Sequence, residues 1–383
     1  MKHVLERKQD CVGCGFCAYI CPVGAISITQ DEGGFYYPSI DEDKCIRCLN
    51  CSNKCPQKAY REQKDTMLTC IAKHRDDSEL KKSTSGAFFY ALCEYVIKNE
   101  GVVYGAGFGS EMRVELHRAI TLEECNELRG SKYVQCDMHN CYELVIYDLN
   151  ENKLVLFSGT PCMVNAILHA TNEIQRNNLI TFDVVCNGVS SPMAWSLFVH
   201  DLEKEYGQML IYYKFRSKEN GYLSKDEVAY FENGDKSVLS WGTDKYTMLV
   251  YYTNRAMRQA CSNCHFATLN RVSDFSSGDC SHLVDKYNDF IGSNGASIIL
   301  VNTEIGKRLL PKLSSYVRFI SIPVGKAKSV RLEKPIEKSS VSKQFIKDIN
   351  KKGLRKATRK QVGYLRWYKS ILHKHLLKVF KCE

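Results

Sequence analysis

Two copies of one cysteine spacing lie within the first 60 residues of this 383-residue chain. The stretch CVGCGFCAYICP begins at Cys11, and CIRCLNCSNKCP begins at Cys45. Each copy reads Cys, two residues, Cys, two residues, Cys, three residues, and then Cys-Pro. Eight cysteines with this spacing indicate that the N-terminal part of the chain folds around groups that are bound by their side chains.

Iron–sulfur clusters are the ligand that fits this spacing best. Three closely spaced cysteines wrap one cluster, and the fourth, before Pro, reaches the other cluster in proteins that hold two. The spacing predicts one [4Fe-4S] cluster on Cys11, Cys14, Cys17 and Cys55, and a second on Cys45, Cys48, Cys51 and Cys21. Zinc is the alternative, but it needs only four ligands and leaves part of each repeat without a use. Such a module transfers one electron at a time.

The chain's 19 cysteines also bear on where the protein works. Its start, MKHVLERKQD, lacks the apolar stretch of a secretory signal, and no run of 18 apolar residues is present. We therefore expect a cytoplasmic protein whose cysteines are thiolate ligands rather than disulfides.

Changes in composition divide the chain into four expected parts. Within the first, AISITQDEGGFYYPSID predicts two strands around a glycine turn. The expected parts are a two-cluster ferredoxin-like domain at 1–62, a linker at 63–82, a main domain at 83–340, and a basic helical tail at 341–383.

The main domain is predicted to be α/β, which makes the whole chain α+β. SGAFFYALCEYVIKNEG has helical spacing, whereas GVVYGAGFG, KLVLFSGTPC, NLITFDVVCNG and ASIILVNT contain continuous apolar strands. Such strands alternating with helices indicate a sheet that is buried on both faces. Ligands bind beyond the carboxyl ends of strands in open α/β sheets, and Cys162 and Cys186 both follow a strand.

Six further motifs carry a family resemblance. They are STSGAFF (83–89), RGSKYVQ (129–135), FSGTPC (157–162), DVVCNGVSSP (183–192), FRSKENGY (215–222) and CSNCHFATLNRVSDFSSGD (261–279). In this order they resemble the coenzyme F420 hydrogenase/dehydrogenase beta-subunit family, in particular bacterial members with an N-terminal two-cluster ferredoxin domain. The resemblance covers roughly residues 1–310.

The resemblance implies a third [4Fe-4S] cluster in the main domain. Its ligands would be Cys162, Cys186, Cys261 and Cys264. From the residues alone, these four thiolates suit iron–sulfur or zinc, and Cys162 and Cys186 could also be small buried side chains.

The resemblance also implies bound FAD. Glycine-rich turns allow backbone amides to reach a pyrophosphate, and Lys132 could supply positive charge to phosphate or to reduced flavin. The residues expected to bind the cofactor are Ser85, Gly86, Gly130, Ser131, Lys132, Tyr133, Gly159, Thr160, Asn187 and Asp279. Arg216 and Arg271 could bind anionic groups of the cofactor or substrate, or they could form surface salt bridges.

These features together predict an oxidoreductase that passes electrons through [4Fe-4S] clusters and FAD. An external carrier of the ferredoxin or flavodoxin type would exchange electrons with it. The resemblance points to a small-molecule, lipid-linked or sugar-linked substrate, with a connection to surface polysaccharides. The alternatives are a non-enzymatic electron-transfer subunit that docks a catalytic partner, and a zinc-bearing scaffold.

The excess positive charge of the chain lies in its tail. Residues 341–383 hold 13 Lys and Arg but only two acidic residues, Asp348 and Glu383. Leu365, Leu372 and Leu376 fall on one face of an expected amphipathic helix. This helix could pack on the body, dock a partner, or lie on an anionic membrane such as the inner membrane surface. Nothing else in the sequence supports binding of nucleic acid.

Overall fold

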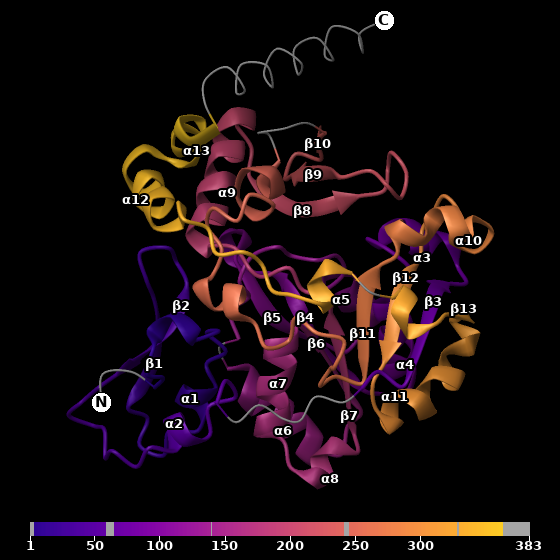
Figure 1. Cartoon of the computed structure of the whole chain (residues 1–383), viewed down its shortest axis with the longest axis horizontal. Coiled ribbons are helices and arrows are strands. Elements are labelled where there is room, and N and C mark those ends of the chain that lie inside the picture. The colour runs from indigo at the N-terminus through magenta and orange to yellow at the C-terminus, as the bar shows by residue number, and fades with distance from the viewer. Residues whose placement is uncertain (1–3, 59–64, 139, 241–244, 328, 363–383) are drawn as a thin grey trace, which may run out of the picture.

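The computed structural model describes residues 4–58, 65–138, 140–240, 245–327 and 329–362. Its main domain is built on an eight-stranded sheet, which confirms the α/β prediction (Figure 1). In sheet order the strands are β13 (Val317–Ser321), β3 (Leu68–His74), β12 (Ser297–Val301), β11 (Phe275–Asp279), β7 (Leu179–Val184), β6 (Val155–Gly159), β4 (Val102–Phe108) and β5 (Val114–Ala119). The four strands β11, β7, β6 and β4 are parallel to one another, and the outer pairings are antiparallel.

Helices cover both faces of the sheet because its central strands are apolar on both sides. Tyr104 and Phe157 pack on one face against α6 (Cys141–Asn150) and α7 (Pro161–Ala170). Their neighbours Val103 and Leu156 pack on the other face against α4 (Phe88–Lys98) and α11 (Glu304–Leu309). The other helices of the main domain are α3 (Asp77–Lys82), α5 (Leu122–Glu127), α8 (Glu173–Arg176), α9 (Pro192–Tyr206) and α10 (Val284–Ile291).

A second sheet lies beside α9, above the large sheet in Figure 1. It is antiparallel and contains β10 (Lys236–Leu239), β9 (Asp226–Phe231) and β8 (Leu210–Ser217). Trp195 of α9 packs there against Tyr213, Phe215 and Tyr246. This aromatic cluster joins the second sheet to the core of the main domain.

The N-terminal domain has the predicted pair of strands, β1 (Ile26–Gln30) and β2 (Tyr36–Ile40). Two one-turn helices, α1 (Phe16–Tyr19) and α2 (Asn50–Asn53), each carry the third cysteine of one repeat. The domain lies against α6 and α7 (Figure 1). Tyr142 donates a hydrogen bond to the Cys14 carbonyl at 2.7 Å, and Asn165 donates one to the Pro56 carbonyl at 3.0 Å.

The linker predicted at 63–82 is mostly part of the main domain. Residues 68–74 form β3, which pairs with β12 on one side and β13 on the other. Residues 77–82 form α3, whose N-cap Asp76 accepts a hydrogen bond from the Ser78 amide at 2.7 Å. The sequence did not predict this strand, because LTCIAKH is a short apolar run between two charged stretches.

The predicted tail also begins inside the body of the molecule. Helices α12 (Ser342–Lys352) and α13 (Leu354–Val362) bury Phe345, Ile349 and Leu354 in the main core. Arg355 of α13 pairs with Glu205 of α9 at 2.5 Å. The amphipathic helix predicted around Leu372 lies outside the described residues.

Short helical turns connect these elements. The 3₁₀ helices are η1 (Lys8–Asp10), η2 (Ser110–Met112), η5 (Gln259–Asn263), η6 (Ser281–Leu283), η7 (Leu310–Ser315), η8 (Val324–Lys326) and η9 (Val330–Leu332), and η4 (Thr247–Tyr251) is a π-helix. Of these, η5 bears directly on the site because it contains Cys261.

Candidate functional site

Four of the predicted ligands form a distal set in the N-terminal domain: Cys21, Cys45, Cys48 and Cys51. Burial raises the pKa of the Cys51 thiol, and negative charge on the other three thiols raises it further. The fourth cysteine of the first repeat therefore lies with the first three of the second repeat. The Ala25 amide donates to Cys21 Sγ at 3.3 Å.

A middle set contains Cys11, Cys14, Cys17 and Cys55. Burial raises the pKa of Cys14 to about 12, and charge on Cys11 and Cys55 adds to the rise. Burial also raises the pKa of Cys17, with contributions from Cys14, Cys11 and Cys55. The Gly13 amide donates to Cys11 Sγ at 3.4 Å, and the backbone of Gly13 has the left-handed φ of +73°.

An inner set, in the main domain, contains Cys162, Cys186, Cys261 and Cys264. Burial raises the pKa of Cys186 well above its ordinary value, and negative charge on the other three thiols raises it further. Cys162 stands at the start of α7, directly after β6, and Cys186 follows β7, the parallel neighbour of β6. The carboxyl ends of two adjacent strands therefore bring these thiols together, as the sequence predicts.

The three sets form a series. Cys17 of the middle set interacts electrostatically with Cys51 of the distal set. Cys14 of the middle set interacts in the same way with Cys162 of the inner set. The spatial order is therefore distal, middle, inner, and it leads from the N-terminal domain into the main domain.

The chemistry of these donors fits [4Fe-4S] clusters. Every cysteine that the structure describes is a free thiol. Within the described residues, no three His, Cys, Asp or Glu side chains lie close enough together to hold a single metal ion. A four-iron cluster makes a different demand, because each thiolate binds its own iron and amide N–H groups face the sulfurs. The amides of Gly13, Ala25 and Gly188 provide such donors.

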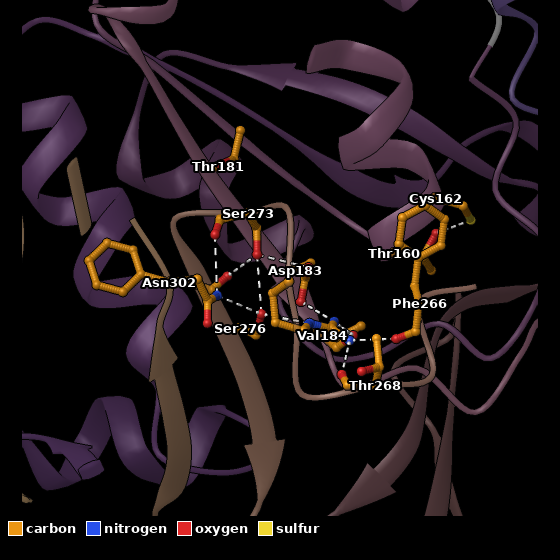
Figure 2. A network of polar contacts seen from close by, with 12 residues as sticks. Thr160, Cys162, Thr181, Asp183, Val184, Phe266, Thr268, Ser273, Ser276 and Asn302 are labelled. Atoms are coloured by element: carbon orange, nitrogen blue, oxygen red, sulfur yellow. Dashed lines mark hydrogen bonds and ion pairs between the residues drawn. The ribbon is translucent and has the colours of Figure 1, made fainter. Parts of the chain in front are cut away.

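A buried ion pair holds the loop that carries Cys261 and Cys264. Arg271 donates to Asp183 Oδ1 at 2.5 Å and to the Phe266 carbonyl at 2.8 Å. Ser273 donates to the other oxygen of Asp183 at 2.8 Å, and the network extends to Ser276 (Figure 2). Arg271 therefore forms a salt bridge, but a buried one rather than the surface pair that the sequence allowed.

A cavity of about 200 Å³ lies where the two domains meet. Its wall includes six of the residues predicted to bind FAD: Ser85, Gly130, Ser131, Lys132, Gly159 and Thr160. The wall also includes Cys14 of the middle set and Cys162 of the inner set. The glycines and apolar side chains such as Phe88 and Met163 give it the mixed character of a cofactor pocket.

The cavity wall contains one lysine, Lys132, whose side chain can gain or lose a proton. Its ammonium group donates to the carbonyls of Glu127 and Arg129, both at 3.0 Å. Burial lowers the pKa of Lys132 to about 7. An anionic ligand in the cavity would favour the charged form of this side chain, since an opposite charge nearby raises the pKa of a lysine.

The other four predicted FAD contacts, all among the described residues, do not line the cavity. Gly86 is packed so closely that a Cβ atom would lie 2.3 Å from the Ala72 carbonyl. Tyr133 packs against Phe215 and Tyr251. Asn187 is in the same neighbourhood, because its side chain hydrogen-bonds Tyr251.

Asp279 is the fourth of these residues, and it forms an ion pair with Arg216. Tyr222 also donates to Asp279, at 3.0 Å. In this structure Arg216 therefore forms a salt bridge. Sequence reasoning missed Gln135 in the cavity wall, although this residue closes the RGSKYVQ motif. It also missed Arg258, which donates a hydrogen bond to Gln135 and which no motif marks.

Comparisons with known proteins give separate matches for the N-terminal domain and for the main domain. A profile described as the C terminus of the coenzyme F420 hydrogenase/dehydrogenase beta subunit matches residues 152–322. A profile described as a 4Fe-4S dicluster domain matches residues 10–59. The chain is therefore related to the coenzyme F420 hydrogenase/dehydrogenase beta-subunit family through residues 152–322. This beta-subunit homologue is thus an iron–sulfur, oxidoreductase-type electron-transfer subunit.

Several relatives of the beta-subunit homologue are ferredoxins or components of oxidoreductases. An uncharacterized ferredoxin from Methanocaldococcus jannaschii is 38% identical over 80 residues, which are 21% of this chain and 96% of the ferredoxin. The PorD component of pyruvate synthase from the same organism is 44% identical over 16% of this chain and 71% of that component. One component of an ion-translocating oxidoreductase complex from Methanosarcina acetivorans is 43% identical over 15% of this chain, which spans about a quarter of that component (24%).

A solved structure resembles the beta-subunit homologue as well. It is the F420-reducing [NiFe] hydrogenase complex from Methanosarcina barkeri, and the match has 17% sequence identity and a TM-score of 0.46. The match covers 78% of this chain and 92% of the other. Among the described residues, no helix combines the length and apolar character needed to cross a membrane.

Proposed function

We propose that this beta-subunit homologue is an iron–sulfur flavoprotein oxidoreductase. It would exchange electrons with a one-electron carrier of the ferredoxin or flavodoxin type and transfer hydride to or from a small-molecule, lipid-linked or sugar-linked substrate. The proposal rests on one observation above all. Cys14 of the middle set and Cys162 of the inner set line the same cavity as the predicted flavin residues.

Each group of residues has a separate task in this proposal. The distal set is nearest to solvent, since Cys48 is exposed, and it would be the side that meets an external carrier. Ser85, Gly130 and Thr160 would hold FAD through backbone and hydroxyl groups. Bound clusters supply one-electron transfer, and bound FAD supplies the coupling to two-electron chemistry.

The positive charge of Lys132 would complement the negative charge of the bound cofactor. Because its pKa is about 7, its ammonium group can be neutral or charged near physiological pH. A positive charge in the cavity wall stabilises negative charge that develops on a ligand beside it. Lys132 would thus favour binding of an anionic cofactor and its acceptance of electrons.

A reductive titration under anaerobic conditions tests this function. With three four-iron clusters and one FAD, the protein should take up about five electrons per chain from reduced ferredoxin, one for each cluster and two for the flavin. The flavin absorbance should bleach during this titration. Uptake of about two electrons with no flavin signal would instead show the electron-transfer subunit without its own flavin.

A further inference from the structure

Arg258 is a buried cation at the junction of the two domains. Its side chain belongs to a residue that is only 1% exposed, and it directly precedes the η5 turn that carries Cys261. The chain folds its guanidinium group toward the N-terminal domain rather than toward solvent. Nothing in the sequence motifs singles out this residue.

Within the described residues, the hydrogen-bond partners of Arg258 are all neutral. Its Nε donates to the Cys11 carbonyl at 2.8 Å, and its Nη1 donates to Gln135 Oε1 at 2.9 Å. Its Nη2 donates to the Tyr36 carbonyl at 2.9 Å. The guanidinium carbon also lies 4.3 Å from the ring centre of Tyr37.

The absence of an acidic partner distinguishes Arg258 from Arg271. Both arginines are buried in the same part of the chain, and Arg271 pairs with the carboxylate of Asp183. No carboxylate in the described part of the chain forms an ion pair with Arg258. A buried charge without an opposite charge is strongly unfavourable, so a folded protein normally supplies one.

Besides the phenol of Tyr37, the groups near Arg258 that can carry negative charge in the described residues include ligand cysteines. One guanidinium bond goes to the backbone of Cys11 in the middle set. Its positive charge also acts on the thiols of Cys162 and Cys261 in the inner set. Arg258 therefore lies between the two sets that adjoin the cavity.

We propose that Arg258 is a positioning residue that serves as the shared counter-charge of the middle and inner clusters and raises the reduction potentials of both. This inference rests on the proposed function, because it needs clusters in both sets. Each added electron makes a cluster more negative, and a fixed cation beside it favours the reduced state. A guanidinium group keeps its charge at all physiological pH values, so the effect is permanent.

The test compares two substitutions in the anaerobically purified protein. Arg258→Met removes the charge, whereas Arg258→Lys keeps it without the forked geometry. Reduction of each cluster is followed by electron paramagnetic resonance during a potential titration, together with iron per chain. We expect Arg258→Met to lower the potentials of the middle and inner clusters by about 59 mV, a tenfold change in the reduced-to-oxidised ratio. The distal cluster should keep its potential in both variants, and Arg258→Lys should shift the middle and inner potentials less than Arg258→Met does.

A second variant keeps the guanidinium in place in case Arg258→Met fails to fold. Gln135→Glu puts a carboxylate at the Oε1 position, 2.9 Å from Arg258, and neutralises the cation. It should lower the same two potentials. Unchanged potentials in whichever of these variants folds, or an equal shift of all three clusters, would overturn the role of Arg258. Wild-type protein without an inner cluster would instead refute the proposed function.

Discussion

Asp183 shows how much of the site depends on single buried side chains. Its carboxylate lies at the end of β7, fully buried, and accepts hydrogen bonds from Arg271 and Ser273 (Figure 2). The pair ties the loop of Cys261 to the strand that leads to Cys186. The buried ion pair between Asp183 and Arg271 therefore fixes the position of this loop relative to the sheet.

Asp183→Asn should destabilise the main domain substantially. The substitution leaves the buried charge of Arg271 without its partner, which typically costs about 3–5 kcal/mol. Urea unfolding followed by tryptophan fluorescence measures this change in the free energy of unfolding. Glu304→Gln is the matched control, since Glu304 pairs with Lys307 on the surface at 3.8 Å and such pairs contribute about 0–1 kcal/mol. Equal effects of the two substitutions would contradict the structural role of Asp183.

Glu227 makes stability depend on pH. It is fully buried, and burial raises its pKa from 4.5 to about 7, although Thr247 and Tyr213 donate hydrogen bonds to it. Between these two values the folded protein keeps the proton and the unfolded chain has lost it. The contribution of Glu227 to stability is therefore lost as pH rises from about 4.5 to 7.

Glu227→Gln should remove this dependence. Between pH 4.5 and pH 7, the free energy of unfolding of the wild type should fall by about 3 kcal/mol more than that of the variant. Lys132 and Lys218 do not obscure the comparison, because burial lowers their pKa values to about 7 and they affect stability mainly above that pH. Parallel pH profiles for the two proteins would show that Glu227 is not the responsible group.

At the scale of elements, the residues just beyond the ends of two parallel strands make the site. β6 leads to Cys162, β7 leads to Cys186, and the loop around η5 adds Cys261 and Cys264. The sequence alone placed Cys162 and Cys186 beyond strand ends, because ligand spacing and strand ends are local features. It did not reveal β3, whose burial depends on pairing with strands more than 200 residues later in the chain.

The residues that line the cavity were harder to predict for the same reason. Ser85, Gly130 and Thr160 come from separate turns that meet only in the folded domain, and all three line the cavity. Tyr133 adjoins them in sequence, yet it packs against Phe215 and Tyr251 instead. A motif indicates which turn approaches a ligand, whereas the direction of each side chain depends on long-range packing.

Cys261→Ala should remove only the inner cluster. Iron should fall by about four atoms per chain, and electrons from a carrier should no longer reduce the flavin, while the two N-terminal clusters remain. Iron analysis and anaerobic absorbance spectra measure both effects. Cys280→Ala is the control, because Cys280 is buried in the same domain but bonds the Ala296 carbonyl at 3.0 Å. If Cys261→Ala kept its full iron content, Cys261 would not be a ligand.

At the scale of the whole molecule, the N-terminal domain and the main domain pack closely where the cysteine sets and the cavity meet. Gly13 allows the close contact, since a Cβ atom there would lie 2.4 Å from Gln135 Nε2 and 2.6 Å from the Tyr36 carbonyl. Arg258 bonds both domains at the same place. The distal, middle and inner sets then lead in order to the cavity wall.

The most direct test of this account is the cofactor content of protein purified without oxygen. Iron, acid-labile sulfide and released flavin are measured on the same sample and divided by the amount of chain. Three thiolate sets and one cavity predict about 12 iron atoms, about 12 sulfides and one FAD. Protein that holds zinc without sulfide, or that is colourless and free of flavin, would contradict it.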